Sequence, residues 1–424
     1  MKKKIATRNF IFITVLLVIA LVFTIFKMPV AFSDYIFKGF ARSYNLGLDF
    51  GKGISATFDV SKTSYYKGNE NNMLADTQKY VQRLVLDEYK DGKVEIVGDQ
   101  IRITVPGDTL SNKVIIGALE MKSSSGEDAK TYVNGSHIKS VKYMMNGTNH
   151  GVYIKFNKAG KKAFEELTTS ASEGDKSVYI YLNQNYEGGR QITGIDTPMT
   201  DGICYISLNS KIEAKTYAKQ LQNSTFGVNL SIDGEATAVK SGLSVYQKVI
   251  VSIGSAMLIA GIVLFFCLKY KGLGLVMSLA FMIGCTLEVI ILSLFNNFLL
   301  NLASLFGMWI SAIVMAVLIY NVVAKSQIEF FNGKKLPVSF KAGYRKSVLL
   351  NLDIVVFGIV ASALLMLIGK GACFTFGMAL IVGMALASLI GMLLIRGFML
   401  MYLQINSNKG NLINFVKGEN VDEI

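Results

Sequence analysis

Histidine, cysteine, tryptophan and proline are scarce in this sequence. Its 424 residues include two histidines, four cysteines, one tryptophan and four prolines. Neither His137 nor His150 lies near paired cysteines, so the sequence has no spacing typical of a metal site. Cys204 is the only cysteine between residues 29 and 247, which excludes a disulfide within that region. We therefore expect a fold that needs neither a metal ion nor a disulfide.

Acidic residues are outnumbered, with 30 Asp and Glu against 43 Lys and Arg and a net charge of +13. Such an excess can indicate nucleic-acid binding, but here the basic residues gather in the segments next to long apolar runs. The main ones are Lys2, Lys3, Lys4, Arg8, Lys269, Lys271, Lys325, Lys334, Lys335, Lys341, Arg345, Lys346, Lys409 and Lys417. Under the positive-inside rule, this distribution places both termini in the cytoplasm and the large hydrophilic region outside. It predicts contact with membrane lipids and no nucleic acid.

Charged residues are almost absent from six apolar stretches. They are Asn9 to Phe26, Val249 to Leu268, Leu273 to Leu294, Leu300 to Val323, Val348 to Ile368 and Phe374 to Tyr402. A helix needs about 20 residues to cross a bilayer, and runs this long exclude barrel strands. The sequence thus predicts an α-helical membrane protein with one span, a large domain and then five spans. A cleavable signal ending near Ala31-Phe32-Ser33 is the alternative for the first span.

The hydrophilic region predicts an α+β domain. Alternating apolar residues indicate strands at 54–60, 94–97, 101–105 and 226–232. Apolar residues at helical spacing follow Asp76, and a second helix begins after the S-x-x-E pair Ser210 and Glu213. This β-α-β-β-α-β order is typical of a ferredoxin-like domain, interrupted before its second helix by about a hundred residues that carry their own strands and helix.

These patterns divide the chain into five regions. We assign residues 1–28 to the cytoplasmic N-terminus and first span, 29–107 and 200–240 to a ferredoxin-like base, 108–199 to an inserted head, 248–403 to a five-helix bundle, and 404–424 to a cytoplasmic tail. No catalytic triad, P-loop or dinucleotide fingerprint is present. We therefore expect a protein that is not an enzyme and holds no cofactor.

Motifs along the whole chain resemble the SecD family of the bacterial secretion machinery, within the resistance-nodulation-division superfamily. Those of the first half are 46–53 (L-G-L-D-F-G-K-G), 101–107 (I-R-I-T-V-P-G), 160–168 (G-K-K-A-F-E-E-L-T) and 189–194 (G-R-Q-I-T-G). Those of the second half are Asn332-Gly333-Lys334, Asp353, Gly369, Gly371, Phe376, Leu380, Gly383 and Arg396. The resemblance implies a SecF-type partner, the SecYEG channel, an emerging unfolded polypeptide as substrate, and a proton or sodium gradient as the driving force.

The chain also departs from the family pattern. Val317 stands where the family's fourth span carries an aspartate, and Ala324-Lys325 where it carries an E-R pair. Ala303-Ser304 replaces a P-G pair, residues 355–358 replace a polar N-x-T-T, and Lys52 replaces a glycine. The acid that the family places in mid-membrane is therefore absent from its usual position.

Three ionisable residues in or near the spans are candidates for ion coupling. They are Glu288, Asp353 and Arg396. A charge in the bilayer costs about 2.5 kcal/mol or more, so each is a functional hypothesis. Glu288 is either a relocated proton site, paired with Arg396, or a carboxyl that is kept neutral by burial or bonded to Thr286 or a neighbouring helix. Asp353 is either functional or solvated at the cytoplasmic boundary, and Arg396 either forms an ion pair or reaches to the interface.

Six motif residues complete the candidates. Gly47, Asp49, Gly51 and Gly53 follow the first span, and Gly369 and Gly371 form either a hinge or a tight turn between the last two spans. Two alternatives to a translocase subunit remain open. One is a degenerate exporter of a lipid or small amphiphile from the same superfamily, and the other is a scaffold without membrane chemistry.

Overall fold

The computed structural model describes residues 2–29, 36–147 and 149–405, which form two compact units. The helical unit contains residues 1–51 and 241–424, and the α/β unit contains residues 52–240. The proposed cleavage site at 31–33 lies outside the described residues, as does nearly all of the expected tail at 404–424.

Long apolar helices make up the helical unit. They are α1 (Lys2–Ile25), α5 (Val245–Ser293), α6 (Leu302–Phe331), α7 (Leu336–Ile368), α8 (Ala372–Ser388) and α9 (Ile395–Ile405), with the π-helical segment η6 (Leu389–Leu394) joining the last two. Counting α8 to α9 as one, five helices among the described residues are long and apolar enough to cross a membrane. Large apolar side chains lie exposed on their outer faces, such as Leu367, which is 82% exposed, as expected for surfaces that meet lipid.

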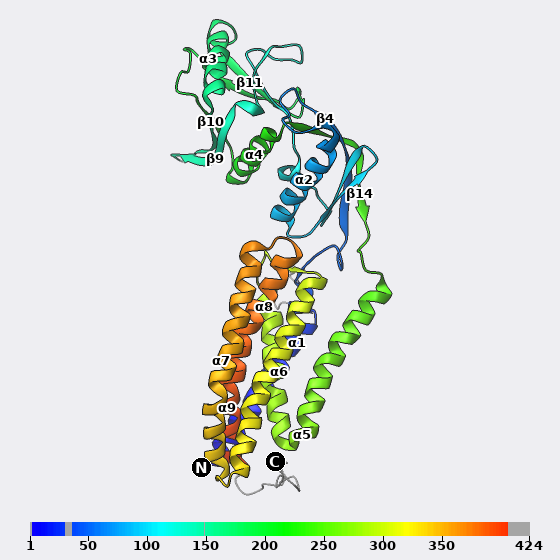
Figure 1. Cartoon of the computed structure of the whole chain (residues 1–424), viewed down its shortest axis with the longest axis vertical. Helices are drawn as coiled ribbons and strands as arrows, with labels where there is room; N and C mark the ends of the chain where they lie inside the picture. Colours follow the sequence, from blue (N-terminus) through cyan, green and yellow to red (C-terminus); the bar gives the residue numbers. More distant parts are fainter. Residues whose placement is uncertain (1, 30–35, 148, 406–424) are drawn as a thin grey trace. The chain divides into compact units, whose positions relative to one another are not determined.

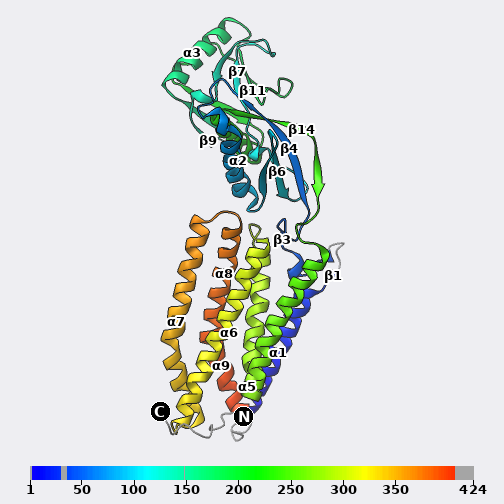
Figure 2. The same cartoon turned by 45° about the vertical axis from the view of Figure 1, so that its right-hand side comes forward.

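Helix α5 doubles back on itself and supplies two apolar segments (Figures 1 and 2). Its backbone leaves the helical conformation at Lys271, with φ 48°. The rings of Phe266 and Phe281 lie 6.4 Å apart across the turn. A β-carbon on Gly274 would lie 2.0 Å from the Phe266 carbonyl oxygen, so the close approach requires glycine there. The two arms correspond to the expected segments 249–268 and 273–294.

Helices α6, α7 and α8 pack against one another, and the second arm of α5 and α9 complete their core. Met277, Phe281, Met315, Ile319 and Phe398 belong to this core. Helix α7 begins at Leu336, twelve residues before the apolar run expected from 348. Pro337 in its first turn suits a helix start, so the basic segment 341–346 is helical and not a loop.

A four-stranded antiparallel sheet and one helix form the base of the α/β unit. The elements are β4 (Gly53–Lys62), α2 (Met73–Tyr89), β5 (Lys93–Val97), β6 (Gln100–Pro106) and β14 (Val228–Val239). The strand order is β14-β4-β6-β5, so β6 lies between β4 and β5 as in a split β-α-β unit. Alternate side chains of these strands, including Phe58, Ile101 and Ile103, pack with Val81 and Val85 of α2.

Two further sheets and two helices form the head. The elements are β7 (Leu119–Lys122), β8 (Thr131–Asn134), β9 (Ile138–Asn146), β10 (Asn149–Phe156), α3 (Lys158–Glu173), β11 (Ser177–Leu182), β12 (Arg190–Thr193), β13 (Ile203–Leu208) and α4 (Lys211–Asn223). The sheet orders are β13-β10-β9 and β12-β11-β7-β8. Both sheets share one core, which includes Val152, Ile154, Phe164 and Ile180.

The boundary expected between base and head needs correction. We assigned residues 200–240 to the base, but β13 pairs with β10 of the head. Ala214, Tyr217 and Leu221 of α4 likewise pack into the head core. The apolar face of α4 was correctly located, but helical spacing alone does not determine which core that face enters. Ser210 caps the helix as expected, accepting a hydrogen bond from the Glu213 backbone N–H at 3.2 Å.

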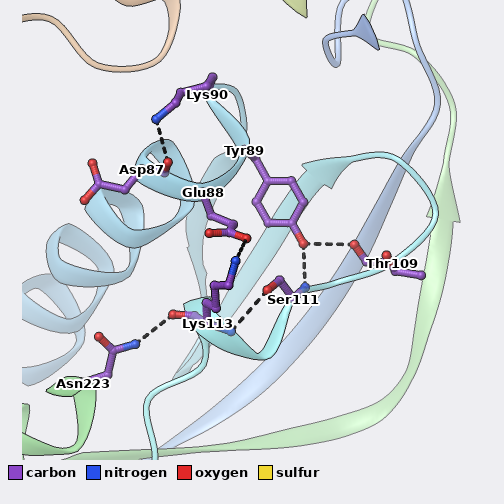
Figure 3. Close-up of polar contacts among 8 residues, drawn as sticks. All are labelled: Asp87, Glu88, Tyr89, Lys90, Thr109, Ser111, Lys113 and Asn223. Carbon is purple, nitrogen blue, oxygen red and sulfur yellow. Dashed lines mark hydrogen bonds and ion pairs between the residues drawn. The ribbon is translucent and has the colours of Figure 1, made fainter. Parts of the chain in front are cut away.

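A polar network links α2 of the base, the segment 109–113 and α4 of the head (Figure 3). The Tyr89 hydroxyl accepts from the Ser111 backbone N–H and donates to the Thr109 carbonyl oxygen at 3.0 Å. Lys113 pairs with Glu88, and the Asn223 amide donates to the Lys113 carbonyl oxygen at 2.8 Å. Base and head are thus joined by directional bonds as well as by the chain.

Candidate functional site

A buried carboxyl group occupies the core of the helical unit. Glu288 lies on the second arm of α5 and is 2% exposed. The Ser311 hydroxyl of α6 donates a hydrogen bond of 2.7 Å to its Oε1 atom. Ser311 itself is fully buried. This hydrogen bond thus joins a carboxyl group and a neutral donor from two helices.

Gly383 of α8 closes this site from a third helix. A β-carbon there would lie 2.1 Å from the Ser311 β-carbon and 2.6 Å from Glu288 Oε1. No real β-carbon approaches another atom so closely, so only glycine fits while Glu288 and Ser311 hold these positions. Three helices thus meet at the carboxyl group, and movement of any one of them changes its surroundings.

The other two candidates for ion coupling lie elsewhere. Asp353 of α7 is exposed, and its carboxylate forms no ion pair with any described residue. Arg396 of α9 is exposed, and its guanidinium carbon lies 4.9 Å from the centre of the Tyr344 ring. The ion pair that we considered between Glu288 and Arg396 is absent. Roles for the three residues in ion coupling remain predictions.

Sequence reasoning overlooked a second buried acid. Glu329, near the end of α6, is 1% exposed and pairs with Lys334 and, at 2.5 Å, with Lys346 of α7. A lone acid at the end of an apolar run, followed by several lysines, was the available signal. This ion-paired cluster ties α6 to α7 at the end of the bundle that carries the basic residues.

The motif 46–53 is a junction of three chain segments. Gly47 donates its N–H to Leu300 at 3.0 Å, beside the parallel pairing of β3 (Asn45–Leu46) with β15 (Leu299–Leu300). The Asp49 carboxylate accepts from the Leu302 backbone N–H at 2.9 Å, at the start of α6. The carbonyl oxygens of Leu48 and Asp49 accept from residues 242 and 243, just before α5.

Gly51 has a packing role in this motif, and Gly53 takes part in strand pairing. A β-carbon on Gly51 would lie 2.8 Å from the Leu46 β-carbon. Gly53 is the first residue of β4 and pairs with Pro106 and Val239. Gly369 and Gly371 form the turn between α7 and α8, where Gly371 has φ 59° and precedes α8.

The α/β unit has a cleft of about 530 Å³ between the head and β14. Its lining residues are Asn112, Ile115, Gly117, Ile180, Leu182, Asn183, Asn185, Gly188, Arg190, Tyr217, Gln220, Ser231 and Ile232. The buried Asn183 Oδ1 and Tyr217 hydroxyl have no hydrogen-bond partner among the described residues. Burial raises the pKa of Tyr217, partly offset by Arg190 over its ring, so its hydroxyl remains a donor at neutral pH. The cleft combines amide groups, a phenol and apolar side chains, which suits a peptide backbone with mixed side chains.

Curated proteins match most of the chain, although no protein-family model does. The SecD subunit of the protein translocase from Dictyoglomus turgidum is 28% identical over 367 residues, covering 81% of this chain and 86% of its own length. That of Acidaminococcus fermentans is 26% identical over 383 residues and covers 87% of both chains. That of Borreliella burgdorferi is 30% identical over 230 residues, covering 53% of this chain and 38% of its own. The chain is thus similar to SecD subunits along most of its length.

The fold agrees with this similarity. A crystal structure of SecDF in its super-membrane-facing form superposes with a TM-score of 0.69 over 95% of this chain, at 19% identity. This chain spans 58% of the SecDF chain. The long apolar helices and the SecD relatives indicate a protein of the bacterial membrane.

The SecD resemblance makes the position of Val317 informative. This residue of α6, which replaces the expected aspartate, is 42% exposed. It lines an apolar groove of about 550 Å³ together with Met257, Phe265 and Tyr320. An acid at this position would therefore face the groove and not the core in which Glu288 lies.

Proposed function

We propose that this SecD-like chain assists protein translocation across the bacterial cytoplasmic membrane, driven by the proton-motive force, with a SecF-type subunit and the SecYEG channel. Its likeness to SecD subunits along four-fifths of its length carries the assignment to protein translocation. The likeness of the fold to a SecDF structure supports a SecF-type partner. Both termini and the basic ends of α6 and α7 face the cytoplasm, and the α/β unit lies outside.

Six helical segments cross the membrane in this proposal, because each arm of α5 serves as a span. Glu288 is the group through which ions couple to movement. Its support is geometric, since the buried carboxyl is hydrogen-bonded to Ser311 and enclosed by Gly383 of a third helix. The gradient of protons or sodium ions is the only energy source required, so the chain is neither an enzyme nor the holder of a cofactor.

The cleft of the α/β unit holds the emerging polypeptide. Its support is the pair of buried polar atoms without partners, Asn183 Oδ1 and the Tyr217 hydroxyl, beside the apolar side chains of Ile180 and Ile232. An extended peptide offers N–H and C=O groups at regular intervals and can satisfy both atoms. Movement of the head against the base, across the network of Figure 3, would then grip and release it.

Site-specific photo-crosslinking tests the cleft. A photoreactive amino acid at Gln220, which lines the cleft, is expected to crosslink a secreted protein arrested during translocation. The matched control is Ile212 on the same helix α4, which is 78% exposed and does not line the cleft. Equal crosslinking at both positions, or crosslinking at Ile212 alone, would show that the cleft does not hold the polypeptide.

The apolar groove beside Val317 favours one alternative, the export of a lipid or small amphiphile. In that case the groove would hold the transported molecule. Accumulation of a lipid in cells that lack the chain, with normal protein secretion, would favour this alternative.

A further inference from the structure

A small amphipathic pocket lies among α6, α7 and α9, away from Glu288. Its volume is about 190 Å³. The lining residues are Val322, Pro337, Phe340, Lys341, Tyr344, Arg396, Met399 and Leu400. None of them is acidic, and two carry a positive charge. The pocket is therefore lined by cations, aromatic rings and aliphatic side chains.

Both cations of this pocket are held on helices. Lys341 is in the second turn of α7, and Tyr344 follows it by three residues, so the two share one helix face. Arg396 of α9 lies over the Tyr344 ring, which fixes the plane of the guanidinium group. Its N–H groups outside that contact suit an oxyanion, which arginine binds through two parallel hydrogen bonds.

The nearby acidic side chain is already neutralised. Glu329 of α6 pairs with Lys334 and Lys346. Neither Lys341 nor Arg396 forms an ion pair with any described carboxylate. The pocket thus retains two positive charges that attract an anion.

The π-helical segment η6 directly precedes Arg396. A π-turn inserts an extra residue into a helix, changes the face on which later side chains project, and often marks a functional position. After η6, Ile395, Phe398 and Met399 of α9 remain buried, whereas Arg396 is exposed at the pocket.

We propose that this pocket binds the phosphate headgroup of an anionic phospholipid. Lys341 and Arg396 contact the phosphate, and the acyl chains lie along the exposed apolar surface near Leu393 and Leu400, which are 62% and 41% exposed. These exposed apolar side chains favour a lipid over a free phosphate ion. Basic pockets between membrane helices at the cytoplasmic side suit anionic headgroups in general.

Binding of phosphatidylglycerol to the purified full-length chain in detergent, followed by native mass spectrometry, tests this proposal. Phosphatidylglycerol is expected to bind more tightly than zwitterionic phosphatidylcholine. Each of Lys341→Gln and Arg396→Gln is expected to weaken phosphatidylglycerol binding about fivefold, the effect typical of one cation near an anionic headgroup. Arg396→Lys, which keeps the charge and loses the planar fork, should give a smaller loss.

Lys370→Gln, at the opposite end of α7, is the matched control and should leave binding unchanged. The melting temperature of each variant verifies that it folds. It should equal that of the wild type, since the replaced side chains are exposed. Equal binding of the two lipids, or unchanged binding in Lys341→Gln and Arg396→Gln, would overturn the proposal. Displacement of the lipid by millimolar inorganic phosphate would show that the site recognises free phosphate and would overturn the lipid assignment.

Discussion

A carboxyl group buried in a membrane bundle is unusual, because a charge there costs free energy unless it is paired. Glu288 has a single hydroxyl donor, Ser311, and no cation in ion-pair contact among the described residues. This setting is the basis of our proposal that Glu288 exchanges an ion when the helices around it move. This residue, and not Asp353 or Arg396, is the one that the helix packing encloses.

The fit of Gly383 against Glu288 predicts the effect of a single methyl group. Gly383→Ala would press a β-carbon against Ser311 and Glu288, and overpacking of this kind typically costs about 1–3 kcal/mol. We expect a lower melting temperature and slower secretion. Gly397→Ala is the control, because nothing lies within 4 Å of the β-carbon it would add. If the two variants behaved alike in thermal unfolding and secretion, the close packing at Gly383 would be irrelevant.

The stability of the turn that contains His137 should depend on pH. Its Nδ1 atom accepts the Asn134 backbone N–H at 3.1 Å, and burial lowers the pKa of His137 below its ordinary 6.5. The unfolded chain then binds more protons than the folded chain just below pH 6.5. The stabilisation is complete above pH 6.5 and is lost as the pH falls through the folded-state pKa.

Hydrogen exchange of the full chain in detergent measures this pH dependence. Amides in the segment 134–138, corrected for intrinsic exchange, should lose protection as the pH decreases from 7 to 5. His137→Asn keeps a side-chain acceptor without a titrating group and should remove the pH dependence. An unaltered pH dependence in His137→Asn would assign it to another group.

At the scale of elements, the motif 46–53 stabilises the start of α6. Asp49→Ala leaves the Leu302 N–H without its carboxylate partner, and the loss of such a bond at a helix start typically costs about 0.5–2 kcal/mol. Asp49→Asn keeps an acceptor oxygen and loses only the charge, so it should cost less. Thermal unfolding of the purified chain in detergent ranks the variants. An Asp49→Ala protein as stable as the wild type would show that the junction contributes nothing to stability.

Elements with a strong local pattern were predictable from the sequence. The apolar stretches gave both arms of α5, and strict alternation located β4, β6 and the first part of β14, because Ile54, Phe58 and Ile101 face one core. Strands β7, β8 and β9 were missed, since their residues are few or alternate weakly between apolar and polar side chains. Helix α4 was found from its cap and spacing, but its assignment to the head core depends on β9 and β10.

The candidate site was predictable only in part, because a local sequence pattern does not indicate contacts between distant residues. Glu288 was identified because an acid inside an apolar run is conspicuous. Its contact with Ser311 and Gly383 involves residues 23 and 95 positions away, and no local pattern indicates that proximity. The cleft around Asn183 and Tyr217 depends likewise on how β11, α4 and β14 come together.

At the scale of the whole molecule, the two units carry different candidate sites. The α/β unit provides a cleft with unpaired polar groups, and the helical unit provides a buried acid. The chain passes between the units at 51–52 and 240–241, and the junction at 46–51 holds the first of these segments beside the starts of α5 and α6. The segments that lead into β4 and out of β14 are therefore the covalent links between the two units.

Pulse-chase release of a secreted protein tests the central claim that Glu288 couples an ion gradient to translocation. Cells depleted of the chain and supplied with wild type, Glu288→Gln or Gly397→Ala are compared with the proton-motive force intact and then collapsed. We expect wild type and Gly397→Ala to speed release only while the proton-motive force is present, and cells with Glu288→Gln to release the protein as slowly as depleted cells. Full activity of Glu288→Gln would contradict the role of this residue. Unchanged release after depletion would contradict a role in secretion altogether.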